Sequence, residues 1–107
     1  MKPQRFDVYL INLDPTIGKE IRKTRPCVIV SPDEMNRHIS TVIIAPLTST
    51  IRNYPTRVTC QFQGKEGQVV LDQLRAVDKK RLVKNLGIIG VDTEKEIFLI
   101  LQQMFSP

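Results

Sequence analysis

Residues 26–47, PCVIVSPDEMNRHISTVIIAPL, contain the pattern that decides the fold. Two nearly continuous apolar runs, Pro26–Ser31 and Thr41–Leu47, are typical of short strands that are covered on both faces. Between them, residues 31–34 (SPDE) form a capping box with proline at the first helical position, which predicts a short helix toward Arg37. Pro46 indicates the end of the second strand or a sheet edge, because proline has no N–H to donate to a neighbouring strand.

Further short strands are predicted on both sides of this stretch. Thr56–Phe62 alternates cleanly, with Val58, Cys60 and Phe62 expected to point inward. The other candidates are Phe6–Leu13, Gln68–Val77 after the turn at residues 63–66, and Leu86–Val91. Five or six short strands separated by turn residues predict a small barrel or sandwich rather than a parallel sheet.

The end of the chain predicts a helix. Residues 93–96 (TEKE) form a second capping box, and an apolar stripe at helical spacing follows it: Ile97, Ile100, Leu101 and Met104. Phe98, Leu99 and Phe105 widen the apolar surface beyond what one barrel needs to cover it. This surplus indicates either a subunit interface or a helix that is buried in its own core.

Composition narrows the class of protein. The chain has 107 residues and no linker or repeat, so we treat residues 1–107 as a single domain. The net charge is +5, and because residues 92–107 carry −2, the rest of the chain carries +7. A basic body of this kind favours nucleic acid, acidic protein segments or an anionic membrane surface as partners. No apolar run approaches the roughly 20 residues of a membrane span, and the polar start is unlike a signal peptide, so a cytoplasmic protein is expected.

One connection is unusually long. Asp14–Thr24 joins two predicted strands with eleven residues, whereas hairpin loops usually have about two to five. Lys19, Arg22 and Lys23 make this segment a basic flap close to Arg25. The plainer alternative is a solvated, charged loop without a function.

Several kinds of chemistry have no support in the sequence. His38 is the single imidazole, so a two-histidine ribonuclease mechanism is excluded. One histidine and two cysteines do not suffice for a Cys/His metal site. Cys27 and Cys60 fall at apolar strand positions, where a thiol usually acts as a small hydrophobic side chain. A glycine-rich phosphate loop is absent as well.

The remaining candidates lie near the flap and the strand ends. Arg25 is held extended by Pro26, and its guanidinium has the planar donor geometry that suits a phosphate. Thr48 and Ser49 follow a strand, where hydroxyls can bind phosphate oxygens. Asp72 and Gln73 interrupt an apolar strand, which is costly unless they form hydrogen bonds or face a cleft.

Eight motifs follow one another along nearly the whole chain. They are Asp7-Val8-Tyr9, Leu13-Asp14-Pro15-Thr16, Gly18-Lys19-Glu20, Thr24-Arg25-Pro26, Ala45-Pro46-Leu47-Thr48-Ser49, Tyr54-Pro55-Thr56, Leu71-Asp72-Gln73-Leu74-Arg75 and Val77-Asp78-Lys79. In this order they resemble the MazF/PemK toxin family. The resemblance implies a mainly β protein with short helices, an SH3-like small β-barrel of the CcdB/PemK type with a C-terminal helix. It also implies a homodimeric, sequence-selective endoribonuclease, an mRNA interferase that cleaves single-stranded RNA without metal or other cofactor.

The resemblance also assigns residues. The family's Arg-Pro arginine falls on Arg25 and the threonine of its Pro-Leu-Thr-Ser motif on Thr48, which makes these the expected catalytic pair. The family's loop glutamate falls on Glu20, and since a carboxylate can serve as a general base, Glu20 is the candidate base if the flap closes. The expected substrate contacts are Lys19, Ser49, Asp72, Gln73 and Arg75. Some relatives carry another arginine two residues before the Asp-Gln aspartate, where this chain has Val70, so a scheme that uses that arginine does not apply.

The family's mechanism is attack of the ribose 2′-OH on the adjacent phosphorus, which gives 2′,3′-cyclic phosphate and 5′-OH ends. Its antitoxins, of the MazE type, carry disordered acidic tails, and a basic body of +7 fits such a partner. No membrane partner is expected.

Two other functions compete. The same fold occurs in CcdB-like toxins that bind and poison DNA gyrase through C-terminal residues, and the Arg25/Thr48 pair would then have no role. A passive RNA-binding barrel is the third interpretation, but only six aromatic residues are present, and several of them are expected in the core.

Overall fold

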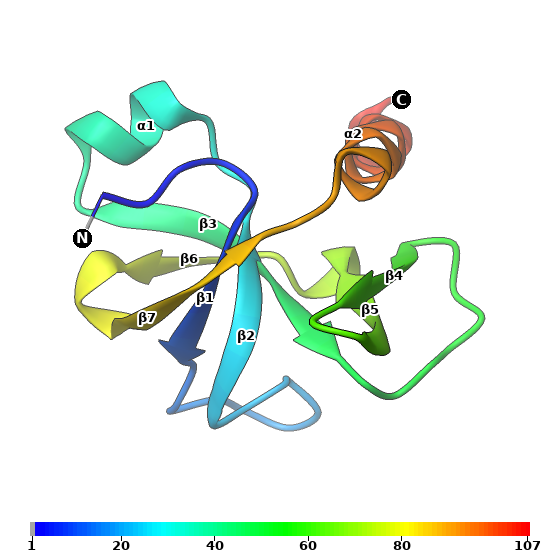
Figure 1. Ribbon diagram of the computed structural model, residues 1–107, viewed down its shortest axis with the longest axis horizontal. Helices are drawn as coiled ribbons and strands as arrows, with labels where there is room; N and C mark the ends of the chain where they lie inside the picture. Colours follow the sequence, from blue (N-terminus) through cyan, green and yellow to red (C-terminus); the bar gives the residue numbers. More distant parts are fainter. Residues whose placement is uncertain (1) are drawn as a thin grey trace.

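The computed structural model describes residues 2–107 (Figure 1). In chain order its elements are β1 (Asp7–Asn12), β2 (Thr24–Ile29), α1 (Asp33–His38), β3 (Thr41–Thr48), β4 (Arg57–Phe62), β5 (Lys65–Val70), η1 (Leu71–Gln73), β6 (Arg75–Asp78), η2 (Lys79–Arg81), β7 (Leu82–Ile88) and α2 (Val91–Phe105). Within residues 2–107, no helix has the length and apolar character needed to cross a membrane.

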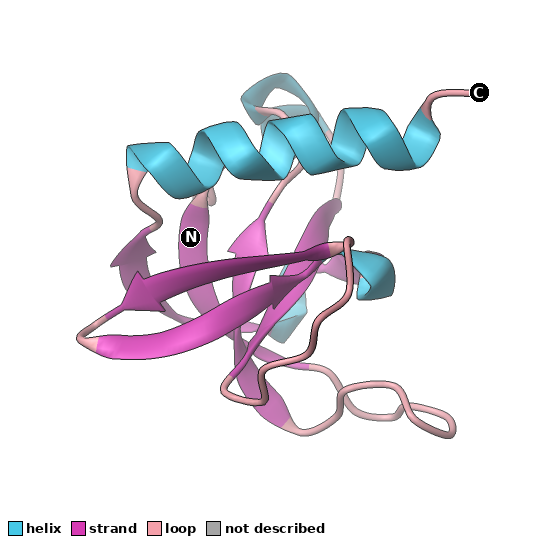
Figure 2. Cartoon of the chain, turned by 90° about the vertical axis from the view of Figure 1, so that its right-hand side faces the viewer, coloured by secondary structure: helices cyan, strands magenta, loops and turns pink. Residues whose placement is uncertain are grey.

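The strands form one curled antiparallel sheet with β3 at its centre. The order along the sheet is β4-β5-β3-β2-β1-β7, and β6 also pairs with β3. β3 therefore has three neighbours: β6 pairs with its first half, and β2 and β5 pair with its second half. Figure 2 shows α2 lying across the strands at one end of the curled sheet. This arrangement confirms the predicted small β-barrel with a C-terminal helix.

Two apolar clusters fill the two faces of the central strands. One cluster lies under α2 and includes Val28, Ala45 and Ile97. The other lies on the opposite face and includes Ile29 and Ile44. Because neighbouring residues of a strand point to opposite faces, β2 and β3 are buried on both sides, as their continuous apolar runs predict.

The predicted strand Gln68–Val77 is wrong as a single element. The chain forms β5 up to Val70, turns through η1, and continues as β6 from Arg75. The break is needed because β5 pairs with the end of β3 and β6 with its start, so the chain must step from one position along β3 to the other. The last strand was also misplaced: β7 spans Leu82–Ile88 rather than Leu86–Val91, because it pairs with β1 over almost its full length.

Both predicted capping boxes are wrong, although both helices exist. The Ser31 hydroxyl donates to Asn36 Oδ1 at 2.5 Å and accepts from the Ile43 amide at 3.0 Å, so it ties α1 to β3 instead of capping the helix. α2 starts at Val91 with Gly90 as its N-cap, two residues before Thr93. The Ser31 hydroxyl is thus used in a tertiary contact, and α2 begins before the predicted cap residue, so neither motif acts as an N-cap.

α2 covers the barrel with the stripe that the sequence predicts. Ile97 is fully buried, and Ile100, Leu101 and Met104 pack against the same cluster. By contrast, the side chains of Phe98, Leu99 and Phe105 are 40%, 53% and 72% exposed. The helix therefore buries one face and leaves an apolar surface, made by Phe98, Leu99 and Phe105, open.

Candidate active site

The candidate active site lies at a fork where β2 and β3 part. The two strands pair from Ile29–Ile44 to Cys27–Pro46 and no further. Beyond that point β2 pairs only with β1, and β3 pairs with β5. Pro26 and Pro46 stand at the fork, and because proline has no N–H, neither can donate a bond that would continue the ladder.

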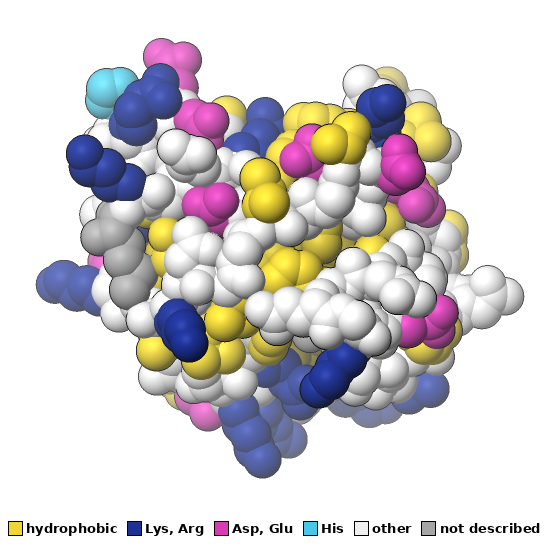
Figure 3. All heavy atoms as spheres, in the orientation of Figure 1, with side chains coloured by type: hydrophobic (Ala, Val, Ile, Leu, Met, Phe, Trp, Pro, Cys, Tyr) yellow, Lys and Arg dark blue, Asp and Glu magenta, His cyan; other side chains and the backbone are white. Residues whose placement is uncertain are grey.

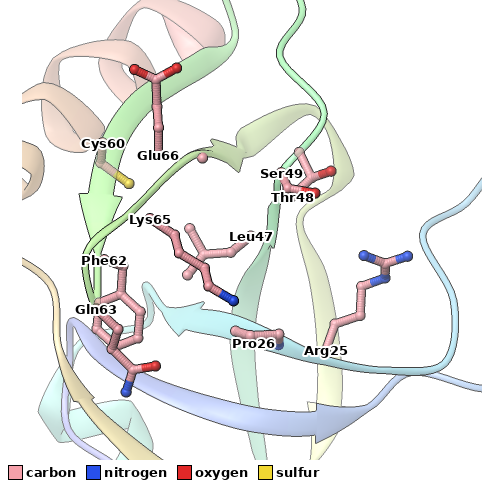
Figure 4. Close-up of a pocket in the computed structure, with 11 residues that line it drawn as sticks. Arg25, Pro26, Leu47, Thr48, Ser49, Cys60, Phe62, Gln63, Lys65 and Glu66 are labelled. Atoms are coloured by element: carbon pink, nitrogen blue, oxygen red, sulfur yellow. The ribbon is translucent and has the colours of Figure 1, made fainter.

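A cavity of about 260 Å³ opens at this fork (Figure 4). Its lining comes from the start of β2, the end of β3 and the β4–β5 hairpin: Arg25, Pro26, Leu47, Thr48, Ser49, Cys60, Phe62, Gln63, Lys65, Glu66 and Gly67. Three of the residues expected from the sequence, Arg25, Thr48 and Ser49, meet here although more than twenty residues separate the first from the other two.

Arg25 and Thr48 occupy matching positions on the two diverging strands. Extending the Cys27–Pro46 register by two residues sets Arg25 opposite Thr48, and opposite residues of an antiparallel pair face the same side of the sheet. The Arg25 Nε donates to the Arg22 carbonyl oxygen at 3.1 Å, which fixes the side chain and leaves the terminal nitrogens of the guanidinium for an anion. Figure 4 shows Arg25 rising from β2 on the side where Thr48 and Ser49 end β3.

The Thr48 hydroxyl is oriented by its own turn. Its Oγ1 accepts a hydrogen bond from the Thr50 amide at 3.1 Å. Because the oxygen is used as an acceptor, the hydroxyl proton remains free to be donated to a ligand. Gly67 permits this geometry, since a Cβ there would lie 2.8 Å from the Thr48 carbonyl oxygen.

Two charged residues of the cavity, Lys65 and Glu66, were missed by the sequence analysis. They open β5, just after the β4–β5 turn, in a polar stretch whose composition is that of any solvated hairpin end, and only the curl of the sheet brings this hairpin to the fork. In Figure 4 the Lys65 side chain reaches across the cavity with its ammonium toward Pro26, whereas the Glu66 carboxylate points away from Arg25. Lys65 thus adds to the positive charge of the cavity.

The other expected residues line a second, smaller hollow of about 200 Å³. Its lining is Glu20, Ile21, Pro46, Asp72, Gln73, Leu74 and Arg75. Pro46 of β3 lines this second hollow, whereas the next residues, Leu47 and Thr48, line the first. Burial raises the pKa of the Cys27 thiol, on β2, to about 12, while the charges of Arg75 and Arg25 act to lower it.

Two side chains hold the Asp72 carboxylate: Arg57, on β4, and Thr56, the residue just before that strand. Arg57 donates to both carboxylate oxygens of Asp72, at 2.8 and 3.3 Å, and the Thr56 hydroxyl donates at 2.9 Å. Burial tends to raise the pKa of Asp72, but the hydrogen bonds from Arg57 and Thr56 outweigh it and lower the pKa. The carboxylate is thus ionised and acts as a hydrogen-bond acceptor. Its expected contact with substrate stays a prediction.

The β1–β2 loop, which contains the predicted flap, is joined to the second hollow. The Gln73 Oε1 accepts from the Ile21 amide at 2.8 Å, and Arg75 donates to the Leu13 carbonyl oxygen at 2.8 Å. Glu20 accepts from the Ile17 amide at 2.7 Å, so the structure places its carboxylate within the loop and in the second hollow, apart from Arg25 and Thr48. Lys19 is exposed and lines neither hollow.

His38 and Cys60, for which the sequence predicts no catalytic role, contribute little to the candidate active site. His38 is exposed at the end of α1 and lines neither hollow, and Figure 3 shows it at the edge of the molecule. Cys60 lines the first cavity but is buried; burial raises the pKa of its thiol, and the Glu96 carboxylate acts in the same direction. Among residues 2–107, no three His, Cys, Asp or Glu side chains are grouped so that they could hold a metal ion.

Basic side chains collect near the fork and the loop. In Figure 3 several Lys and Arg side chains lie along the lower edge, which is where Figure 1 shows the β1–β2 loop. An exposed positive surface beside a cavity that offers guanidinium, ammonium and hydroxyl donors suits a phosphate-containing polymer.

Known proteins share this architecture over the whole length of the chain. The fold matches the MazF structure from Deinococcus radiodurans with a TM-score of 0.85 and 26% identity, covering 97% of this chain and 96% of that one. It also matches an endoribonuclease from mycobacterial species in complex with its cognate antitoxin, with a TM-score of 0.80, 29% identity and coverage of 94% and 92%. A MazE–MazF complex from Deinococcus radiodurans matches with a TM-score of 0.80, 25% identity and coverage of 97% and 96%.

A family model gives the same result from the sequence. The model for the PemK-like, MazF-like toxin of type II toxin-antitoxin systems matches residues 4–105. This range includes both hollows and the whole of α2. The chain therefore belongs to the PemK-like, MazF-like family of toxins of type II toxin-antitoxin systems.

Proposed function

We propose that this protein is a sequence-selective endoribonuclease that cleaves single-stranded RNA in the cytoplasm without a metal ion. The observation that carries the proposal is the fork, where Arg25 and Thr48 face the same cavity from two strands that no longer pair. A guanidinium and a hydroxyl at such a site can bind two nonbridging oxygens of one phosphate. The endoribonuclease among the solved relatives supports the same reaction class.

The reaction is an internal transfer within the RNA. The ribose 2′-oxygen forms a bond to the adjacent phosphorus and loses its proton, while the bond from phosphorus to the 5′-oxygen breaks and that oxygen gains a proton. The products are a 2′,3′-cyclic phosphate and a 5′-hydroxyl. Because the substrate supplies the nucleophile, the protein needs none.

Arg25 and Thr48 stabilise the transition state of this reaction. The phosphorane-like transition state carries more negative charge on its nonbridging oxygens than the substrate does. The fixed Arg25 guanidinium donates to that charge, and the free proton of the Thr48 hydroxyl donates a second bond. Lys65 adds positive charge over the same cavity.

The attacking 2′-OH must lose its proton to a base. Arginine stays protonated in proteins, so Arg25 is an unsuitable base. Glu20 acts as the base only if the β1–β2 loop rearranges, because its carboxylate is bonded to the Ile17 amide and lies in the second hollow.

We also propose two protein partners. A homodimer would cover the apolar surface of Phe98, Leu99 and Phe105, which the barrel leaves exposed. An acidic antitoxin of the MazE type would bind near Arg25 and the β1–β2 loop and compete with RNA. Solved relatives in complex with antitoxins support the second partner.

One cleavage experiment tests the proposed reaction. The protein is incubated with single-stranded RNA in EDTA, and again with a substrate that carries a 2′-deoxy nucleotide just 5′ of the cut. Cleavage in EDTA that stops on the deoxy substrate is the expected result. Cleavage of the deoxy substrate, or loss of activity in EDTA, contradicts the mechanism. A protein that inhibits gyrase supercoiling but leaves RNA intact is a CcdB-like poison instead.

The antitoxin is tested by titration. The product of the neighbouring gene, or its C-terminal peptide, is added to the cleavage reaction at physiological salt. Stoichiometric inhibition is expected. Binding that disappears at modest salt and leaves cleavage intact indicates a nonspecific attraction between opposite charges.

A further inference from the structure

The side chain of Gln68 acts as a strand partner for a loop. Gln68 is only 3% exposed, on β5. Its Oε1 accepts from the Arg52 amide at 3.0 Å, and its Nε2 donates to the Arg52 carbonyl oxygen at 3.0 Å. One side-chain amide thus satisfies both backbone groups of Arg52, which lies in the loop between β3 and β4.

The backbone of Gln68 holds the other end of the same segment. Gln68 pairs with Thr48 at the last position of the β3–β5 ladder. Residues 48–52 are therefore held at both ends by this one residue, through its backbone at Thr48 and through its side chain at Arg52.

The turn held in this way sets the direction of the Thr48 hydroxyl. Two residues into the segment, the Thr50 amide donates to Thr48 Oγ1 at 3.1 Å. If Arg52 were released, the loop could move the Thr50 amide, and the Thr48 hydroxyl would then lose the contact that orients it. Residues 49–52 are exposed, so the bonds from Gln68 anchor a segment that is not packed into the core.

We propose that Gln68 is a positioning residue for Thr48. The proposal rests on the proposed endoribonuclease function and adds a residue that touches neither RNA nor the reacting phosphate. An amide is required because Arg52 presents one donor and one acceptor at once. An ionised carboxylate accepts but does not donate, and an apolar side chain does neither.

The test compares Gln68→Met with a matched control. Gln68→Met keeps the length of the side chain and removes both bonds to Arg52. The control, Thr59→Val, removes only the third partner of the Gln68 amide, a hydroxyl 3.1 Å from Nε2. We expect Gln68→Met to lower kcat about three- to fivefold with KM within about twofold, a part of the about tenfold loss expected for Thr48→Val. Thr59→Val should keep wild-type kcat.

A double variant separates positioning from general damage to the fold. In the Thr48→Val background, Gln68→Met should cost nothing further, because the hydroxyl that it positions is gone. Amide hydrogen exchange gives a second readout that needs no cleavage: Gln68→Met should speed exchange at Thr50 and Arg52, and Thr59→Val should not.

The outcomes distinguish this proposal from the proposed function. An additive loss in the double variant, unchanged kcat in Gln68→Met, or unchanged exchange at Thr50 overturns the role of Gln68 and leaves the endoribonuclease intact. A wild-type protein that does not cleave RNA, or a Thr48→Val variant that cleaves at the wild-type rate, overturns the site itself and the positioning role with it.

Discussion

Arg25 places a positive charge at the start of β2, beyond the last residue pair that joins β2 to β3. Arg25→Ala should leave the fold intact, because the side chain is half-buried at a strand end, and should lower RNA cleavage by about 10²-fold or more. Arg25→Lys should recover only part of the activity, because an ammonium keeps the charge without the planar pair of donors.

The rates are measured on a single-stranded RNA, with circular dichroism to confirm folding. Lys19→Ala is the control, since Lys19 lies on the loop and lines neither hollow. It should weaken binding in a salt-dependent way and leave the rate at saturating RNA unchanged. Wild-type cleavage by a folded Arg25→Ala protein would contradict the site.

Asp72 predicts a pH dependence of stability. Its folded-state pKa lies below the ordinary value of 3.8, so the Asp72–Arg57 pair stabilises the protein above that value and loses its contribution as the pH falls through the lowered pKa. Asp72→Asn should lower the free energy of unfolding near neutral pH by less than about 1 kcal/mol, since the carboxylate is partly exposed. Urea unfolding of both proteins over a range of pH should show the difference shrinking in acid. A difference that is constant or grows in acid contradicts this assignment.

Sequence patterns predicted several residues of the candidate site, but they did not predict how these residues are arranged in space. Arg25, Thr48 and Ser49 were expected from strand-end chemistry and from the family motifs, and they meet in one cavity. Lys65 and Gln68 could not be identified, because the role of each depends on the curl of the sheet. Lys65 opens β5 in an ordinary polar stretch, and a lone glutamine in an apolar strand shows no sign of its partner Arg52. Glu20 was expected to act as the base if the flap closes, which stays a prediction; its position in the second hollow depends on the path of the long β1–β2 loop, and sequence patterns do not predict such a path.

Among the elements, β5 lies so close to β3 that only glycine fits at position 67. A Cβ there would lie 2.8 Å from the Thr48 carbonyl oxygen, a backbone atom that cannot rotate away. Gly67→Ala should therefore push β5 from the end of β3, lowering the free energy of unfolding by about 1–3 kcal/mol and reducing cleavage through displacement of Thr48.

Thermal unfolding and cleavage rates are measured together, with Gly90→Ser as the control. Gly90 is the N-cap of α2, with no atom within 4 Å of an added Cβ, and serine is a favoured N-cap residue. The control should keep or slightly raise the stability. A Gly67→Ala protein as stable and active as the wild type would show that the two strands adapt to the extra atom.

Strand boundaries were predicted well where the hydrophobic pattern of the sequence matches the burial of that strand in the sheet. The alternation in Thr56–Phe62 corresponds to β4, and the apolar run Thr41–Leu47 corresponds to β3. The pattern fails at residues 68–77, where a continuous apolar stretch hides the step from one neighbour position on β3 to another. Its one visible sign was the polar pair Asp72 and Gln73, which lies in η1 where the chain turns.

For the whole molecule, the exposed apolar surface of α2 predicts the oligomeric state. Leu99→Glu and Phe105→Glu each place a charge in the surface of the proposed dimer, so each should shift the protein from dimer to monomer in sedimentation velocity. Both side chains are more than half exposed in the single chain, so the fold should survive. Gln61→Glu adds the same charge at an exposed polar site on β4 and should remain dimeric. A dimer that persists in both α2 variants places the interface elsewhere.

The fork between β2 and β3 also has a consequence for the cost of binding. Inserting a ligand between two strands of a sheet normally requires the hydrogen bonds that join them to be broken first. Here the ladder stops at Cys27–Pro46, and two imino acids without N–H stand at the gap, so no bond of that kind exists to be broken. Each diverging strand end is meanwhile held by another neighbour, β1 or β5. The gap is therefore open without a ligand, and an RNA strand bound there, as proposed, would meet a preorganised site without first breaking strand pairing.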